Sequence, residues 1–133
     1  MSKMNPEIKQ LWINELRNPD NKQITGRLKS DSGRCCIGVL ADLAVEAGIL
    51  KEVYSNATGD SGYQVIGEFS LERFEAPKAL QGWAGLPSAE GHLPASVSGS
   101  NGRENVQYGS LVALNDSAGF TFAQIADVIE EYL

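Results

Sequence analysis

The sequence predicts an α+β fold, in which about three helices surround a small antiparallel sheet or pair of hairpins. Amphipathic periodicity at both ends of the chain indicates two of the helices. A nearly continuous apolar segment from about Ile37 to Ala47 indicates a third, central helix that is buried. The chain has 133 residues, of which 42% are apolar, enough to bury one core. We therefore predict a single domain over residues 1–133.

The N-terminal half begins with a helix predicted over residues 6–17. Asn5 is a suitable N-cap, and Pro6 fits the first helical position. The central helix is expected to end at Gly48, because glycine readily adopts the left-handed conformation that closes a helix. Between these helices, residues 22–30 are predicted to form a short strand or one arm of a hairpin, since a β-capable segment there runs into a turn.

The C-terminal half mixes one strand, two helices and a long polar segment. Residues 63–69 are predicted to form a strand, and residues 77–85 a helix of two turns. Residues 87–107 are rich in Ser, Gly and Asn and are expected to be a mobile or functional loop. The last helix is predicted over residues 122–132, because apolar residues recur there at helical spacing behind the capping-box pattern T-x-x-Q.

The overall charge and the cysteine content exclude several classes of function. Seventeen acidic and 11 basic residues give a net charge of -6, which disfavours binding to nucleic acid. No apolar run approaches the roughly 20 residues of a membrane span, and the N-terminus lacks a signal-peptide core, so we expect a cytoplasmic protein. Two adjacent cysteines supply neither a disulfide framework nor a zinc site, and we expect no metal or cofactor.

Four sequence blocks together resemble a family of small proteins encoded by tailed phages and prophages. The blocks are Q-x-x-G-x-L at 23–28, G-x-C-C-x-G-V-L at 33–40, W-A-G-L at 83–86 and L-N-D…F-x-x-I-A-D-x-I-E at 114–130. The resemblance implies a viral accessory protein, and it brings no established catalytic residues with it.

Basic residues are concentrated just before the central helix. Lys22, Arg27, Lys29 and Arg34 are opposed only by Asp31, so this segment carries a local charge of +3 (four minus one). A helix N-terminus also favours an anion, and we expect these residues, together with neighbouring Gln23, to bind a phosphate group. The alternative is a solvated hairpin edge whose charges serve solubility.

Three further residues are candidates for contacts with the rest of such a ligand. The amide of Asn115 and the carboxylate of Asp116 are able to recognise a ribose or a base edge, although Asn-Asp is also common turn chemistry. Trp83 can stack on an adenine-like ring, or it can simply belong to the core. Neither of the glycine-rich phosphate motifs is present, which excludes nucleotide hydrolysis by a P-loop.

Cys36, His92 and the Asn115–Asp116 pair follow the chain order of a papain-like triad. The order alone is weak evidence for a catalytic triad. A general base must be held close to its nucleophile, and His92 lies in the most Gly- and Ser-rich segment. We expect both thiols to be structural, with one facing the core and its neighbour pointing into the turn before the central helix.

These observations favour a non-catalytic phage protein that sequesters a small, phosphate-bearing, nucleotide-derived signal of host immunity. The first alternative is an inhibitor that binds a protein of a host defence complex, and the second is a cysteine-dependent hydrolase. We expect the protein to form a homodimer or higher homo-oligomer, because small sequestering proteins gain pocket walls between subunits.

Overall fold

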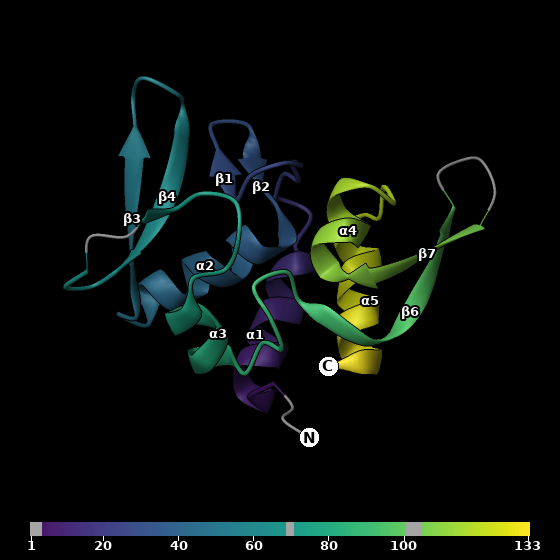
Figure 1. Cartoon of the computed structure of the whole chain (residues 1–133). Coiled ribbons are helices and arrows are strands. Elements are labelled where there is room, and N and C mark those ends of the chain that lie inside the picture. The colour runs from purple at the N-terminus through teal and green to yellow at the C-terminus, as the bar shows by residue number, and fades with distance from the viewer. Residues whose placement is uncertain (1–3, 69–70, 101–104) are drawn as a thin grey trace.

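A computed structural model describes residues 4–68, 71–100 and 105–133, and its architecture is α+β (Figure 1). Five helices lie within the described residues: α1 (Pro6–Leu16), α2 (Cys36–Glu46), α3 (Lys78–Ala84), α4 (Leu111–Asp116) and α5 (Phe122–Tyr132). None of them is both long and apolar enough to cross a membrane.

An antiparallel sheet lies on one side of α2, and a separate two-stranded ribbon extends on the other (Figure 1). The sheet contains β1 (Lys29–Ser30), β2 (Gly33–Arg34), β3 (Leu50–Ser55), β4 (Asp60–Val65) and β5 (Leu71–Glu72). Its order is β2-β1-β4-β3, and β5 pairs with the later part of β4. The ribbon contains β6 (His92–Ser100) and β7 (Asn105–Ser110).

The core is built around α2, which packs against α1, α3, α4 and the sheet. Its residues from Cys36 to Ala41 are all buried. Gly38 permits an unusually close approach, because a Cβ atom there would lie 1.9 Å from the backbone oxygen of Leu28. The helix therefore lies directly under the chain that leads into β1, where the basic segment is also found.

The predicted fold class and the buried central helix are confirmed. The Asn5 side chain accepts hydrogen bonds from the first turn of α1, as expected of an N-cap. At α5, Thr121 and Gln124 form both bonds of the capping box. The short helix expected over 77–85 is α3.

The expectation of a loop over residues 87–107 is wrong. Most of this stretch forms the paired strands β6 and β7, while residues 101–104 lie outside the described part of the chain. Its Ser, Gly and Asn content gives weak intrinsic strand preference, but partner strands supply the backbone hydrogen bonds, and strand formation depends more on this context than on propensity.

Three smaller expectations also need correction. Of residues 22–30, only Lys29–Ser30 forms a strand. The strand expected over 63–69 is β4, which begins earlier at Asp60 and ends at Val65, while Phe69 lies outside the described residues. The turn expected at Asn115–Asp116 is the last turn of α4, because Ser110 caps a helix that begins at Leu111.

Candidate functional site

The N-terminus of α2 is closed by the protein's own side chains. The Oδ1 atom of Asn115 accepts hydrogen bonds from the backbone N–H of Cys36 at 3.2 Å and from Nε2 of Gln23 at 2.8 Å. Its Nδ2 atom donates to the backbone oxygen of Ile24 at 2.8 Å. The structure thus brings Gln23 and Asn115 together, but their hydrogen bonds are made within the protein.

Residues from three of the four sequence blocks meet around this helix end. Asp116 accepts a hydrogen bond from Asn115 at 2.8 Å, and Trp12 Nε1 donates to the backbone oxygen of Cys36 at 2.9 Å. Gln23 Nε2 also donates to the backbone oxygen of Phe120 at 2.8 Å. These contacts give the blocks a structural role, since they hold α1, α2 and α4 together around buried polar groups.

Both cysteines are buried, as expected. Cys36 is inaccessible to solvent, and Cys35 caps α2 by accepting a hydrogen bond from the N–H of Gly38 at 3.4 Å. Burial raises the pKa of Cys35 to about 11 and raises that of Cys36 well above its ordinary value. His92 has an exposed side chain, and no contact joins it to either thiol within the described part of the chain.

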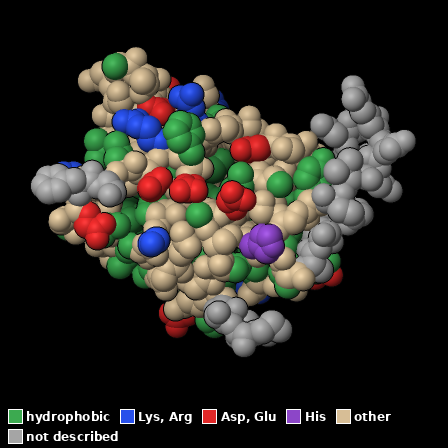
Figure 2. Space-filling view, in the orientation of Figure 1, with side chains coloured by type: hydrophobic (Ala, Val, Ile, Leu, Met, Phe, Trp, Pro, Cys, Tyr) green, Lys and Arg blue, Asp and Glu red, His purple; other side chains and the backbone are tan. Residues whose placement is uncertain are grey.

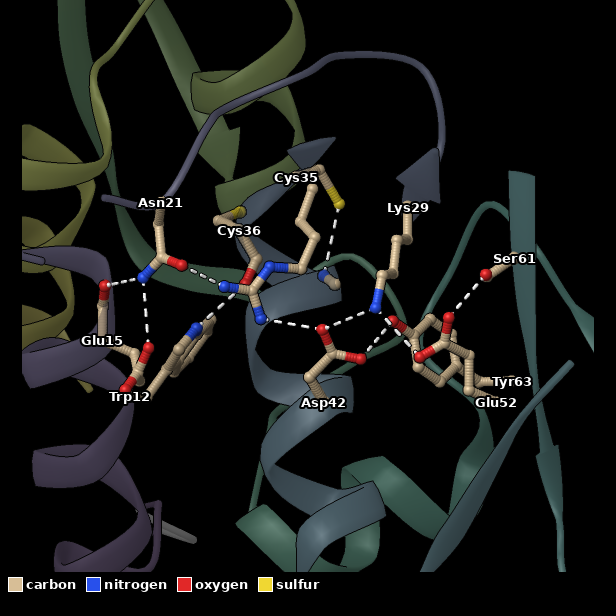
Figure 3. A network of polar contacts seen from close by, with 12 residues as sticks. Trp12, Glu15, Asn21, Lys29, Cys35, Cys36, Asp42, Glu52, Ser61 and Tyr63 are labelled. Carbon is tan, nitrogen blue, oxygen red and sulfur yellow. Dashed lines mark hydrogen bonds and ion pairs between the residues drawn. The ribbon is translucent and has the colours of Figure 1, made fainter. Parts of the chain in front are cut away.

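Two of the expected phosphate-binding cations form a polar network with carboxylates (Figure 3). Arg34 Nη1 donates to Asp42 Oδ2 at 2.7 Å, while Nη2 donates to the side chain of Asn21. Lys29 Nζ lies 3.4 Å from Asp42 Oδ2 and 2.9 Å from Glu52 Oε1. Two positive and two negative charges balance, so this network has no net charge for an anion to neutralise.

Hydroxyl groups of β4 complete the network. Tyr63 donates to Asp42 Oδ1 at 2.6 Å, and Ser61 donates to Glu52 Oε2 at 2.6 Å. Burial beside Asp42 raises the pKa of Tyr63. Partial burial alone would raise the pKa of Glu52, but hydrogen bonds from Ser61 and Lys29 outweigh it and leave this pKa lowered. The network therefore fastens α2 to β1, β3 and β4.

A second charged group lies on the other face of the sheet. Successive side chains of a strand point to opposite faces, so Asp60 faces away from the network that its neighbour Ser61 joins. The Asp60 carboxylate is only 5% exposed, and it lies 2.8 Å from Arg73 Nη1 and 3.5 Å from Arg27 Nη1. A hydrogen bond from Thr58 and the two guanidinium groups lower the pKa of Asp60.

The two arginines of this group retain contact with solvent. The side chain of Arg27 is 40% exposed and that of Arg73 is 29% exposed. Their segments are joined because the Leu28 N–H donates to the backbone oxygen of Arg73 at 2.8 Å. These three side chains by themselves carry a net charge of +1. A further carboxylate, that of Asp31, lies beside Gly59 and accepts a hydrogen bond from the Tyr54 hydroxyl. We call Arg27, Asp60 and Arg73 the arginine pair site.

The side chains of the remaining two candidates join neither group in the described part of the chain, although the backbone oxygen of Lys22 accepts a hydrogen bond from the N–H of Arg34 at 2.9 Å. Lys22 is exposed and forms no ion pair within the described residues. Trp83 is half-buried on α3 and packs against the core. The eight residues singled out in the sequence are therefore not gathered into one site.

A pocket of about 320 Å³ opens between β4, β5 and the start of α3. Val65, Pro77 and Ala79 form apolar parts of its lining. Glu72 and Lys78 add charges of opposite sign, and Glu68 adds a second carboxylate. This excess of negative charge makes the pocket a poorer place for a phosphate than the arginine pair site.

Sequence reasoning missed the acidic partners and one arginine. Asp42 was detectable, because it is a carboxylate in the middle of an otherwise apolar helical segment. Asp60, Glu52 and Arg73 carried no comparable signal, because each meets its partners through strand pairing or through a contact between loops.

The family model for DUF8296, a domain of unknown function, matches residues 4–133. The chain belongs to this family. No curated protein and no solved structure matches it significantly. The DUF8296 match spans all four sequence blocks and carries no statement of viral origin, so the phage resemblance remains an interpretation of those blocks.

Proposed function

We propose that this DUF8296 protein binds a phosphate-bearing small ligand without altering it chemically, and that the arginine pair site holds the phosphate. The observation that carries the proposal is the convergence of Arg27 and Arg73 on one buried carboxylate with a charge of +1 left over. Lys29 and Arg34 belong to the charge-balanced network and are assigned a structural role.

The chemistry of the pair suits a phosphate. A guanidinium group has five N–H donors in a planar fork, and one contact to Asp60 leaves most of them for a second anion. Asp60 holds both groups in place before the ligand arrives, which reduces the ordering that binding would otherwise require. Because both side chains are partly exposed, a ligand reaches them without rearrangement of the core.

Binding without catalysis is the interpretation that fits the thiols. A cysteine nucleophile acts as the thiolate, and both thiols are buried with raised pKa values. The cysteine-hydrolase alternative therefore ranks last.

The biological part of the proposal follows the sequence resemblance. In this view the ligand is a nucleotide-derived signal of host immunity, and a phage-encoded protein sequesters it in the cytoplasm of the host cell as a homodimer or larger homo-oligomer. The net charge of -6 supports a small ligand over DNA or RNA, because the whole molecule repels a polyanion.

Titration calorimetry against a panel of linear and cyclic nucleotides tests the proposal. Arg27→Glu and Arg73→Glu should abolish binding, while Arg27→Lys should weaken it because lysine lacks the planar fork. Lys51→Glu is the matched control, since it makes the same charge change at an exposed residue of β3. Equal affinity in wild type and all of these variants would contradict the assignment, as would the absence of any binding by wild type.

The protein-binding alternative has one observation in its favour. Figure 2 shows several acidic side chains across the middle of one face of the molecule. Such a surface is able to imitate nucleic-acid charge toward a basic partner. If no nucleotide binds, Glu68→Lys and Glu72→Lys become the variants to test, because these two carboxylates line the same pocket, and both should weaken an inhibitor of this kind.

A further inference from the structure

Phe74, the residue that follows Arg73 in the chain, is exposed on the surface. Its side chain is 63% exposed, the highest value among the large hydrophobic residues of the described chain. Figure 2 shows hydrophobic surface directly beside Lys and Arg side chains at the upper left, over the region of β1 and β4. A large exposed aromatic ring beside cations is a common arrangement for binding a planar, negatively charged ligand.

The segment that carries Phe74 is anchored on both sides. Before it, the backbone oxygen of Arg73 accepts the hydrogen bond from Leu28. After it, the N–H of Ala76 donates to the backbone oxygen of Ala89 at 3.1 Å, and Ala76 itself is buried. The exposed ring thus lies between two fixed points of the backbone, and ligand binding would not have to order a loose loop.

We infer that Phe74 stacks on a planar aromatic ring of the ligand whose phosphate the arginine pair site holds. This inference rests on the proposed function and assigns a residue to the base of its nucleotide-derived ligand. Arg73 and Phe74 are consecutive in the chain, and a nucleoside monophosphate separates ring and phosphate by one sugar, so one ligand has a suitable length to reach both residues. Sugar phosphates and inorganic phosphate would use the arginines alone.

Phe74 is not required by the core, which makes it suitable for substitution. Phe74→Ala removes the ring, and Phe74→Trp restores a larger stacking surface. Ile66→Ala is the matched control, because Ile66 is similarly exposed at 61% and lies beyond the end of β4. Thermal melting of each variant checks that the fold is retained.

The test compares adenosine monophosphate, uridine monophosphate, ribose 5-phosphate and inorganic phosphate by titration calorimetry on the four proteins. In wild type the nucleoside monophosphates should bind about tenfold more tightly than ribose 5-phosphate, as expected for one stacked base. Phe74→Ala should remove that advantage and leave binding of ribose 5-phosphate unchanged. Phe74→Trp and Ile66→Ala should keep it.

The outcomes separate this inference from the proposed function. If ribose 5-phosphate and the nucleoside monophosphates bind equally to wild type, or if Phe74→Ala keeps the preference, the stacking role is overturned while phosphate binding stands. If none of the four ligands binds wild type, both are overturned.

Discussion

The side-chain oxygen Oδ1 of Asn115 lies 3.2 Å from the backbone nitrogen of Cys36, 79 positions earlier in the chain. A residue at the end of α4 thereby satisfies the N-terminus of α2, which was expected to hold an anion. Helix N-termini require partners for their free N–H groups, and here the fold supplies one internally.

Asn115→Ala should destabilise the protein by about 1–3 kcal/mol, because the N–H of Cys36 and the amide of Gln23 would lose a buried acceptor. Urea denaturation measures the change in the free energy of unfolding. Asp116→Ala is the neighbouring control and should cost less, since Asp116 is exposed. Unchanged stability combined with lost nucleotide binding in Asn115→Ala would instead assign this residue to the ligand.

Cys36→Ser should lower stability by an amount on the order of 1–3 kcal/mol, because a hydroxyl costs more to bury than a thiol and Cys36 is fully buried, with its sulfur 3.7 Å from the backbone oxygen of Leu111. Cys36→Ala should be milder, and neither substitution should affect nucleotide binding. Native protein should react only slowly with a thiol reagent near neutral pH, given the raised pKa values of both thiols. Rapid labelling of the folded protein, with loss of function in both variants, would restore the nucleophile interpretation.

Asp42→Ala should cost about 1–3 kcal/mol, because Arg34, Lys29 and Tyr63 would all lose a common partner in a half-buried position. The contrast is Asp127→Ala, which removes an exposed ion pair with Arg17 and should cost less than about 1 kcal/mol. Equilibrium unfolding of both variants checks the difference. Similar small losses in the two proteins would show that the network adds little to stability.

The free energy of unfolding should fall as acid protonates Glu52. The pKa of Glu52 is lowered in the folded protein, so its stabilising effect is present above its ordinary value of 4.5 and is lost as the pH falls through the lower folded value. Glu52→Gln should flatten the dependence of stability on pH below about 4.5, in unfolding curves measured from pH 3 to 7. Glu68→Gln, at an exposed glutamate, is the control. If both variants changed the dependence of stability on pH equally, the effect could not be assigned to Glu52.

Light scattering coupled to size-exclusion chromatography should give a mass that is a multiple of the 14.3 kDa chain. The expectation follows from the proposed sequestering role, and isologous dimers are the most frequent closed assembly. A single species at 14.3 kDa over a range of protein concentrations would remove self-association from the proposal.

The sequence by itself determined the elements whose signals are local. Asn5 and Pro6 start α1, and Thr121 with Gln124 starts α5, because a cap is formed by residues within one turn of each other. The apolar content of α2 likewise required a buried helix wherever the rest of the chain lay. Fold class and the burial of both thiols followed from these signals.

Only the tertiary structure decided which of the basic side chains remain available to a ligand. In the sequence, Lys29 and Arg34 belong to the same basic segment as Arg27. In the fold, strand pairing places Glu52 beside Lys29, and the packing of α2 places Asp42 beside both Lys29 and Arg34, so these two cations are balanced. Arg27 and Arg73 instead both contact Asp60, and their separation of 46 positions (73 minus 27) hides this grouping from any local pattern. Electrostatic partners are chosen by distance in space, and strand register and loop contacts set that distance only once the chain has folded.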